Sequence, residues 1–566
     1  MLMRRAGKRE QSASTQGVLP DWLGIAGLCL VAFALRCIGT EGRPFENDEL
    51  YHVLAGHSWA VGHGVSIAGG EYLRVRLYTI ATGISVELFG GSPLAVRLPA
   101  IIAGTLQVWA SFVWVRAVAG RRAAWTAALL VCFSFRLIDL SQLARFYSWH
   151  VLAIWIFATQ VYALVGSWAM LGTGERIVRT MVATAALGLA LYIQTTTVIA
   201  AIAIGLWAAP VLARSLGFHR WSRGLWLSAG LGLAVMLVAV AVAGGALLAA
   251  IREFRHVALW AEAGGNRPTF YYSLLANSYG WLLHLLPIAA LLAYRKWSRP
   301  TWFCMVIVVV GLFLHSFAGM KSDRYISYLD PFILSIWAMA TASLLAPIRE
   351  LVALPFRSLP DRLAMLLAVA VTAVAASSAV VGVPMYRATL SEVLRLARGE
   401  PPFANPDQAD NESVDWTPYM AKLRPLTHAS MLVTADDLRA LRYLGGFDLL
   451  LNRTVMWDFT QVEFGVDPRT GAHGITSAPS LAAVMDCYPS GAILVSNRRW
   501  RSQDVTASAA DFIERTAKPV PLPAGLRMRA FTWRGPDRRE TPACQALSRQ
   551  IGDRRQRMGE RLVRLR

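Results

Sequence analysis

Long apolar runs dominate the first two thirds of the chain. A helix needs ~20 predominantly apolar residues to cross a bilayer. Runs near this length occur at about 22–39, 94–116, 123–139, 146–168, 178–193, 196–213, 224–250, 270–293, 301–318, 325–346 and 363–383. The pattern predicts an all-α polytopic membrane bundle of about 11 transmembrane helices.

One shorter apolar run, 77–89, does not fit this series. Charged residues flank or interrupt it at Arg74, Arg76 and Glu87. A short apolar helix with such flanks is typical of an element that lies in the membrane interface. We therefore expect an interfacial helix in the loop of about 40–93 that follows the first span.

The chain becomes polar after residue 385, and the stretch 400–417 is typical of a linker. Beyond it, short apolar runs alternate with helix-like segments. The expected strands lie at 430–434, 447–451, 492–496 and 526–533, and the expected helices lie at 436–444, from 480, and at 507–516. This alternation predicts a C-terminal α/β domain. The expected units are a tail (1–21), a bundle (22–385) and an α/β domain (386–566) that ends in a basic segment.

Composition supports a membrane protein. Hydrophobic residues make up 55% of the chain, against ~45–50% in soluble domains. The net charge is +20 and is carried mostly by arginine. A nucleic-acid partner is not expected, because no basic soluble module with interleaved aromatic residues is present.

Loop charges predict the orientation of the bundle. Basic residues precede the first helix, at Arg4, Arg5, Lys8 and Arg9. If that end is cytoplasmic, every other inward loop is also basic, as the positive-inside rule requires. The inward basic residues are then Arg116, Arg121, Arg122, Arg176, Arg179, Arg214, Arg220, Arg223, Arg295, Lys296, Arg299, Arg349, Arg357 and Arg362. An odd number of spans places the first loop and the α/β domain outside.

The outward loops also contain cations, which the same rule does not explain. They are Arg74, Arg76, Arg97, Arg145, Arg252, Arg255, Lys321 and Arg324. Any one of them is explained by snorkelling to the interface. Together, they indicate a guanidinium-lined site for a phosphate at membrane level, because arginine binds phosphate in a bidentate manner.

The acidic group Glu46-Asn47-Asp48-Glu49 lies in the same first outer loop. Asp48 is the candidate general base; its alternative role is a helix N-cap or a solvated loop acid. One expected role of the neighbouring carboxylates is to raise the Asp48 pKa toward neutrality. Glu46 is a further candidate, and with Asp48 it offers the oxygen ligands of a divalent cation, an alternative that stays open.

Histidine and cysteine residues add two smaller expectations. His52 follows the acidic group and is a further candidate site residue, but two histidines at 52 and 57 without a cysteine partner favour ordinary interfacial residues over a zinc site. Cys487 and Cys544 lie in the α/β domain and are able to pair if that domain faces an oxidising compartment.

Four motifs in order resemble a known family. They are RPFENDELYHV (43–53), FGGSPLAVRLPAIIAG (89–104), ARFYSWH (144–150) and KSDRYISYLDPFIL (321–334). The pattern, over about 20–345, resembles the polytopic glycosyltransferases of the C-type (GT-C) fold. These enzymes use lipid phosphosugars and include protein O-mannosyltransferases, lipid A aminoarabinose transferases and lipid A core galacturonosyltransferases.

The resemblance implies roles for individual residues. Asp48 matches the catalytic acidic position, with Glu49 as the adjacent carboxylate. Arg145, Tyr147, Arg324 and Tyr325 match family positions beside the donor site. The cations of the outward loops add Arg74, Arg76 and Lys321 to the residues expected to bind the donor phosphate or sugar. One departure is that many relatives have Pro-Pro-Leu where this chain has Arg74-Val75-Arg76-Leu77-Tyr78.

The implied activity is that of an inverting glycosyltransferase at the outer face of the bacterial plasma membrane. It moves a monosaccharide from a polyprenyl-phosphate donor to a protein, a lipid A or core acceptor, or a cell-envelope glycan. Such a reaction needs a base for the acceptor proton and cations for the phosphate charge. The expected partners are therefore the lipid donor, the acceptor and membrane lipids.

Two alternatives remain. A polysaccharide polymerase or ligase uses a lipid-linked donor but transfers long chains. A transporter or flippase is the less favoured alternative, because transporters place charged residues near the bilayer midplane, whereas the charges here gather at one face.

Overall fold

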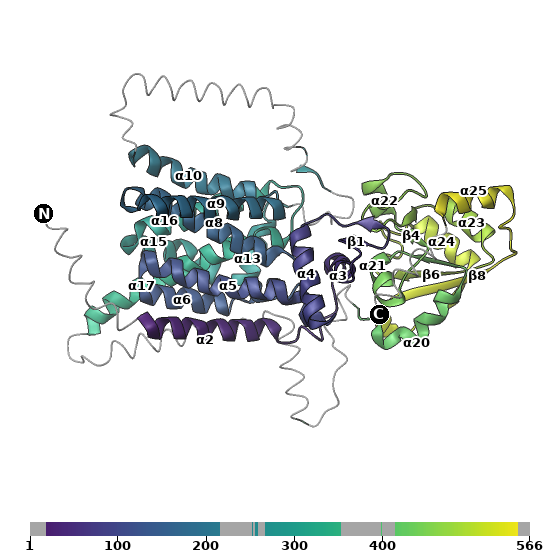
Figure 1. Cartoon of the computed structure of the whole chain (residues 1–566), viewed down its shortest axis with the longest axis horizontal. Helices are drawn as coiled ribbons and strands as arrows, with labels where there is room; N and C mark the ends of the chain where they lie inside the picture. The colour runs from purple at the N-terminus through teal and green to yellow at the C-terminus, as the bar shows by residue number, and fades with distance from the viewer. Residues whose placement is uncertain are drawn as a thin grey trace, which may run out of the picture.

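The computed structural model describes residues 18–215, 252, 255–257, 267–352, 398 and 414–552. These residues form a helical bundle with an α/β domain at one end (Figure 1). The α/β domain lies next to the loop of about 40–93, which is named the first outer loop after its expected side of the membrane. The expected spans at 224–250 and 363–383, most of the N-terminal tail, the start of the α/β domain at 386 and the basic segment 554–566 lie outside the described residues.

The bundle consists of long helices that lie side by side and of shorter ones between them (Figure 1). They are α2 (Val18–Cys37), α5 (Pro93–Ala119), α6 (Arg121–Cys132), α7 (Phe135–Ser141), α8 (Tyr147–Ser167), α9 (Thr173–Ile193), α10 (Thr197–Ser215), α13 (Phe270–Tyr279), α14 (Trp281–His284), α15 (Leu286–Lys296), α16 (Ser298–Ser316) and α17 (Asp330–Val352). By length and composition, four described helices are able to cross a membrane: α5, α8, α9 and α16. The bent pair α6–α7 raises this number to five.

Two expected spans are not continuous helices. The run 123–139 divides into α6 and α7, which meet at an angle of 53°. The run 270–293 divides into α13, α14 and α15. Gly280 has a positive φ of 51°, a conformation that most residues avoid, and it separates α13 from α14. Apolar periodicity detects the run but not such breaks.

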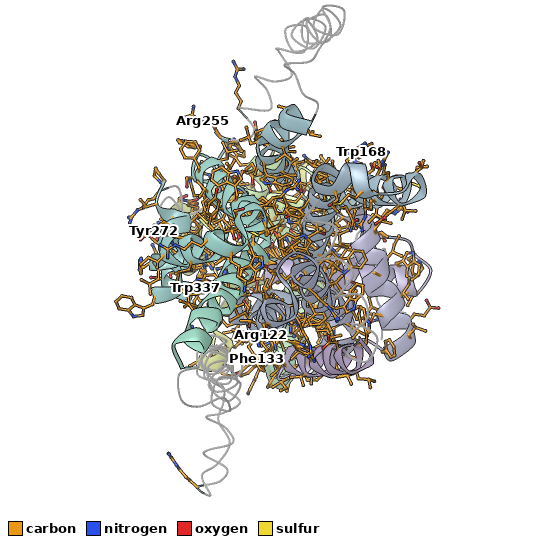
Figure 2. All side chains as sticks on the ribbon, turned by 90° about the vertical axis from the view of Figure 1, so that its left-hand side faces the viewer. Arg122, Phe133, Trp168, Arg255, Tyr272 and Trp337 are labelled. Atoms are coloured by element: carbon orange, nitrogen blue, oxygen red, sulfur yellow. A yellow bond between two sulfur atoms is a disulfide. The ribbon has the colours of Figure 1, made fainter. Side chains whose placement is uncertain are left out.

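Close packing holds the bundle together. Figure 2 views it from the end away from the α/β domain, and side chains fill the space between the helices. Trp337 there donates its Nε1–H to the Leu282 carbonyl at 2.9 Å. A Cβ atom on Gly104 of α5 would lie 2.0 Å from Ser141 Oγ of α7. Glycine is therefore required for these two helices to approach.

The first outer loop forms a compact structure on the bundle. It contains α3 (Asn47–Ala60), the antiparallel hairpin of β1 (Ser66–Ile67) and β2 (Gly70–Glu71), and α4 (Arg76–Phe89). The expected interfacial helix at 77–89 corresponds to α4. Helix α3 begins inside the acidic group, so the N-terminal turn of α3 positions Asp48 and Glu49.

The C-terminal region is an α/β domain around one six-stranded sheet of order β5-β4-β3-β6-β8-β7. The strands are β3 (Met431–Thr434), β4 (Leu449–Leu451), β5 (His473–Ile475), β6 (Ser490–Ser496), β7 (Lys518–Val520) and β8 (Met528–Arg534). Strands β3 to β6 pair in parallel, whereas β7 and β8 are antiparallel. The α/β expectation is confirmed, although β5 and β7 were not expected.

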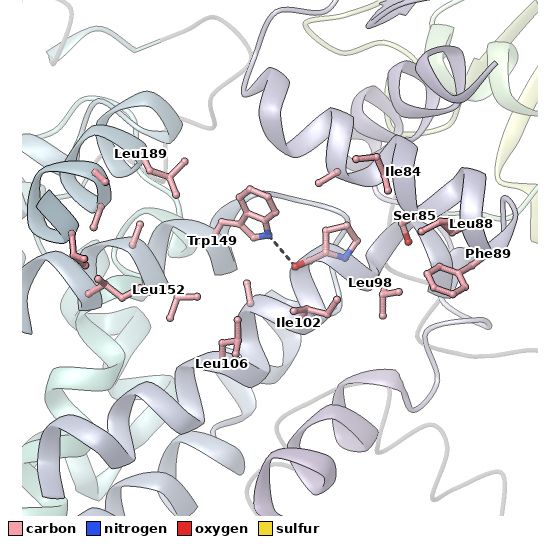
Figure 3. A pocket seen from close by; sticks show the side chains of 18 residues that line it. Ile84, Ser85, Leu88, Phe89, Leu98, Ile102, Leu106, Trp149, Leu152 and Leu189 are labelled. Carbon is pink, nitrogen blue, oxygen red and sulfur yellow. Dashed lines mark hydrogen bonds between the residues drawn. The ribbon is translucent and has the colours of Figure 1, made fainter. Parts of the chain in front are cut away.

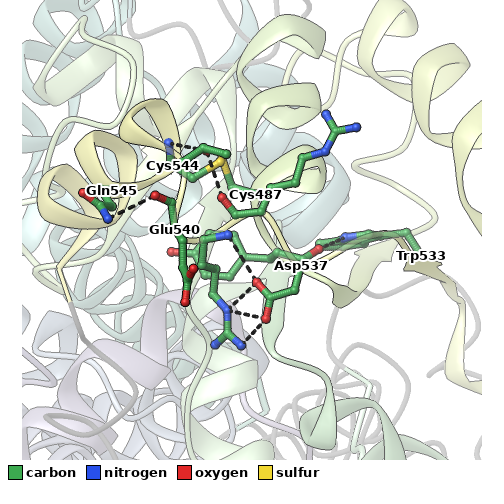
Figure 4. The surroundings of a disulfide bond; sticks show 10 residues. Cys487, Trp533, Asp537, Glu540, Cys544 and Gln545 are labelled. Atoms are coloured by element: carbon green, nitrogen blue, oxygen red, sulfur yellow. Dashed lines mark hydrogen bonds and ion pairs between the residues drawn. A yellow bond between two sulfur atoms is a disulfide. The ribbon is translucent and has the colours of Figure 1, made fainter.

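Helices surround this sheet. The main ones are α20 (Met420–Leu423), α21 (Asp437–Arg439), α22 (Arg453–Phe459), α23 (Ala478–Cys487), α24 (Ala507–Thr516) and α25 (Pro542–Ile551). The expected helix at 436–444 divides into α21 and a π-helical segment, η9 (Ala440–Leu444). A disulfide joins Cys487 at the end of α23 to Cys544 in α25 (Figure 4).

Candidate active site

The acidic group begins helix α3. The backbone N–H of Glu46 donates to Glu49 Oε2 at 2.8 Å, one half of a capping box. Asp48 lies in the first helical turn, and half of its side-chain surface is exposed (50%). In this turn Asp48 is directed toward the surface, whereas Glu49 is directed into the protein.

Glu49 is completely buried in an ion pair with Arg97. Arg97 Nε lies 3.0 Å from Glu49 Oε1, and neither side chain is exposed. Glu49 Oε1 also accepts the Ala144 backbone N–H at 2.6 Å. The same guanidinium donates to the carbonyls of Thr40 and Arg43. Glu49 therefore holds the first outer loop onto α5 and is not exposed at the surface.

Two arginines from distant segments bind Asp48. Arg324 Nη1 lies 3.2 Å and Arg145 Nη2 lies 3.4 Å from Asp48 Oδ2. Arg145 also donates from Nη1 to the Asp48 carbonyl at 2.7 Å. Arg145 precedes α8, and Arg324 lies in the 3-10 turn η4 (Asp323–Tyr325). The expected residues Asp48, Arg145 and Arg324 thus form one cluster.

Glu46 extends this cluster. It pairs with Arg324 and with Arg43, whose Nη2 lies 3.2 Å from Glu46 Oε1. Arg43 in turn binds Asp139 of α7 at 2.9 Å. Cations and carboxylates alternate along this series of ion pairs, so each charged side chain has a neighbour of opposite charge.

The ionisation of Asp48 corrects one expectation. Partial burial raises the pKa of this carboxyl, but the guanidinium groups of Arg145, Arg324 and Arg74 outweigh burial and hold the pKa below its ordinary value. The expectation of a pKa raised toward neutrality by adjacent carboxylates was wrong, because these guanidinium groups hold the pKa below its ordinary value. Burial instead raises the pKa of Glu46.

The other expected donor-site residues lie around this cluster. Arg74 is exposed, and its guanidinium lies 5.4 Å from the centre of the Phe146 ring. The Tyr147 hydroxyl accepts from Arg145 at 3.4 Å. Burial raises the pKa of Tyr325 to about 12.

Two further residues were expected at the donor site, Lys321 and Arg76. Lys321 donates to the Ala318 carbonyl at 2.7 Å and thereby closes the turn after α16. Arg76 is exposed at the first position of α4.

His52 is buried beneath the cluster. Its Nδ1 lies 2.8 Å from Thr79 Oγ1, and its ring contacts Tyr72, Tyr78 and Phe146 edge to face. Burial holds the pKa of His52 well below its ordinary value. A neutral, enclosed imidazole packs α3 against α4. Within the described ranges, no group of three His, Cys, Asp or Glu side chains is placed to hold a metal ion.

Several residues of the site were not expected from the sequence. Arg136 of α7 forms a buried pair with Asp330 at 3.1 Å and donates to the Asp323 carbonyl, so it holds the segment that contains Arg324. Arg469 of the α/β domain lies over the Tyr51 ring at 5.0 Å. These arginines lie outside the motifs, and no local pattern distinguishes them from surface arginines.

An apolar groove of about 650 Å³ opens along α4, α5, α8 and α9 (Figure 3). Its lining includes Ile84, Ile102, Leu152 and Leu189. Trp149 lies at one wall and donates its Nε1–H to the Pro99 carbonyl at 2.9 Å. Arg74 precedes α4, and Arg145 precedes α8.

Comparison with known proteins depends on structure alone. A scan of protein-family models finds no match, and neither does a search of curated proteins. The crystal structure of apo ArnT from Cupriavidus metallidurans matches with a TM-score of 0.57 at 16% identity, covering 91% of this chain and 98% of that chain. The chain has the C-type glycosyltransferase fold.

Two further structures agree. ArnT bound to undecaprenyl phosphate matches with a TM-score of 0.56 at 14% identity, covering 90% of this chain and 98% of that chain. The oligosaccharyltransferase AglB from Archaeoglobus fulgidus, in complex with an inhibitory peptide and a dolichol-phosphate, matches at 0.51 and 12% identity, covering 92% and 74%. The expected C-type fold is thus confirmed, while the roles of individual residues rest on their geometry in this chain.

Proposed function

We propose that this protein is an inverting glycosyltransferase that takes a monosaccharide from a polyprenyl-phosphate donor. The observation that carries the proposal is the exposed Asp48 carboxylate between Arg145 and Arg324. The C-type fold supports it, because ArnT and AglB of that fold are solved with lipid phosphates.

The groove suits the polyprenyl tail of the donor. It is lined almost entirely by apolar side chains from four helices. Burying each CH₂ of a tail contributes about 0.8 kcal/mol. Because α4 and α8 begin beside Arg74 and Arg145, a tail in the groove brings its phosphate toward these guanidinium groups.

The arginines suit the phosphate. A guanidinium carries five N–H donors, so Arg145 and Arg324 are able to bind a phosphate oxygen while still paired with Asp48. Their positive charge stabilises the negative charge that develops on the leaving phosphate. Arg136 and Asp330 keep the Arg324 segment in place during this step.

Asp48 acts as the general base. Its depressed pKa keeps the carboxylate ionised at neutral pH, so it accepts the proton of the acceptor hydroxyl or amine. The acceptor atom then forms a bond to the anomeric carbon as the bond from that carbon to the phosphate oxygen breaks. The electron pair of the broken bond stays on the polyprenyl phosphate, and the anomeric configuration inverts.

Transfer by purified protein in liposomes tests this function. Polyprenyl-phosphate sugars of defined anomeric configuration are the donors, and cell-envelope lipid, glycan and protein fractions are the acceptors. We expect one sugar per acceptor site with inverted configuration by NMR. A product with retained configuration, or long-chain products from oligosaccharide-bearing lipids, would contradict the proposal; the second result would favour a polymerase or ligase.

The site is proposed to work at the outer face of the plasma membrane. The first outer loop and the α/β domain lie at the same end of the bundle (Figure 1). The disulfide between Cys487 and Cys544 supports an oxidising compartment for that end. The acceptor is therefore proposed to be a protein, lipid or glycan of the cell envelope.

A further inference from the structure

The α/β domain touches the first outer loop through a glycine-to-glycine backbone contact. The Gly69 N–H donates to the Thr470 carbonyl at 3.1 Å. A Cβ atom on Gly70 would lie 2.6 Å from the Arg469 carbonyl oxygen, and one on Gly471 would lie 2.6 Å from the Gly69 carbonyl carbon. Gly471 also has a φ of +67°, which side chains disfavour. This docking contact therefore requires glycine on both sides.

Arg469 lies at this contact in a fixed orientation. Its Nε and Nη2 donate to the two oxygens of Asp467 at 3.1 and 3.2 Å. The Asp467 side chain is fully buried. The guanidinium lies 4.4 Å from the Phe459 ring centre and 5.0 Å from the Tyr51 ring centre. A bidentate pair and two aromatic faces leave the side chain little freedom.

This orientation places a positive charge of the α/β domain at the active site. Tyr51 lies three residues after Asp48 on α3, so the two residues share one helix face. Arg469 faces Asp48 from the α/β-domain side, whereas Arg74, Arg145 and Arg324 come from the bundle and its loops.

Charged and titratable groups surround both Asp48 and Arg469. Those that interact with Asp48 are Tyr51, Tyr72, Arg74, Arg145, Arg324, Tyr325 and Arg469. Those that face Arg469 are Tyr51, Asp437 and Asp467.

We propose that Arg469 is a positioning residue of the active site, held beside Asp48 by the docking of segment 467–471 on the β1–β2 hairpin. The α/β domain thereby completes the site instead of only covering it. This inference rests on the proposed function, because it acts through Asp48 as the base.

The proposal predicts how activity depends on pH. The Arg469 charge is one of those that lower the pKa of Asp48. A base with a depressed pKa is active above that pKa, and activity is lost as the pH falls through it. Removing the Arg469 charge raises the pKa, so the acid limb of kcat/KM moves to higher pH.

The experiment compares pH profiles of sugar transfer for full-length variants. Arg469→Gln should move the acid limb to higher pH, and Arg469→Lys should leave it close to wild type because the charge is kept. Gly471→Ala should reproduce the Gln shift, since it disrupts the docking contact without removing a charge. Arg501→Gln, at an exposed arginine that pairs with Asp511 and Glu514 elsewhere in the α/β domain, is the matched control.

Each outcome of this experiment either supports or overturns the role of Arg469. An acid limb unchanged in Arg469→Gln would overturn the inference, even if the maximal rate falls, because a structural role lowers rates without moving the profile. If Arg469→Gln does not fold, Arg469→Lys and Gly471→Ala carry the comparison, and equal profiles for these two would also overturn it. Absence of any transfer by wild type would instead count against the proposed function.

Discussion

Asp48 and Glu49 are adjacent carboxylates in opposite environments. Glu49 is enclosed with Arg97, while Asp48 keeps half of its side-chain surface open. Both have a pKa below the ordinary value, Glu49 because Arg97 outweighs its burial and Asp48 because several arginines do. Glu49 is therefore proposed to hold the first outer loop, and Asp48 is proposed to act as the base.

The Glu49–Arg97 pair should dominate the stability of the first outer loop. Arg97→Met leaves a buried carboxylate without its partner, which costs about 3–5 kcal/mol. The thermal midpoint of the detergent-solubilised protein should fall clearly. The double variant Glu49→Leu/Arg97→Met should recover part of this loss, because it leaves no buried charge.

The stability that the Glu49–Arg97 pair contributes depends on pH. The pKa of Glu49 is lower in the folded protein, so the stabilisation is present above its unfolded pKa and is lost as the pH falls through the folded pKa. A thermal midpoint of Arg97→Met equal to that of wild type at neutral pH would contradict this account.

At the residue scale, the sequence allowed part of the site to be predicted. An acidic group in an otherwise apolar loop identified Asp48, and motif order identified Arg145 and Arg324. The sequence-based expectation for the pKa of Asp48 was wrong because it took account only of neighbours in sequence, whereas Arg324 lies 276 residues away. Arg469 had no local signal, because its role depends on how two distant glycine-containing segments meet.

At the scale of elements, helices α4, α5, α8 and α9 form the apolar groove. Its proposed function is to hold the polyprenyl tail of the donor. Ala185 of α9 is exposed and lines the groove. Ala185→Trp should obstruct it and raise KM for long-chain polyprenyl donors while leaving kcat nearly unchanged. Donors with a short prenyl chain should be affected much less.

Leu191→Trp is the matched control on the same helix. Leu191 is 38% exposed and is not part of the groove lining. Equal effects of the two substitutions, or equal effects on short and long donors, would show that the groove does not hold the tail.

Long helices were easier to predict from the sequence than the points at which apolar runs divide into separate helices. Runs of apolar residues matched α5, α8, α9 and α16, because length and composition suffice for a long helix. The division at Gly280 depends on a positive φ, and that of α6 from α7 depends on packing. Helix α3 was expected only in the alternative that makes Asp48 a helix N-cap, since its buried face includes Glu49 and His52 and its apolar pattern is weak.

The whole molecule has a bundle and an α/β domain that meet at the first outer loop. Apolar residues of both parts, including Leu50 and Tyr51 of α3 and Leu438 of α21, belong to one buried cluster. The sequence predicted both units, but not that the α/β domain adds a charge to the site. That contact is a property of the assembled chain.

Orientation is tested on the intact chain. Asp537→Cys and Arg122→Cys, in a background without the free cysteines at 29, 37, 132 and 304, are exposed to a membrane-impermeant maleimide in spheroplasts. We expect labelling at 537 before lysis and at 122 only after lysis, because the account places the α/β domain outside. The reverse pattern would place the site on the cytoplasmic side.

The central claim is that Asp48 is the base of a sugar transfer, and Asp48→Asn tests it most directly. A general base contributes about 10²–10⁴-fold to the rate. In liposomes with a polyprenyl-phosphate sugar and acceptor, Asp48→Asn should lose transfer by about this factor while folding and binding polyprenyl phosphate normally. Asp537→Asn, at an exposed aspartate of the α/β domain, should transfer at the wild-type rate. Wild-type transfer by folded Asp48→Asn would contradict the account.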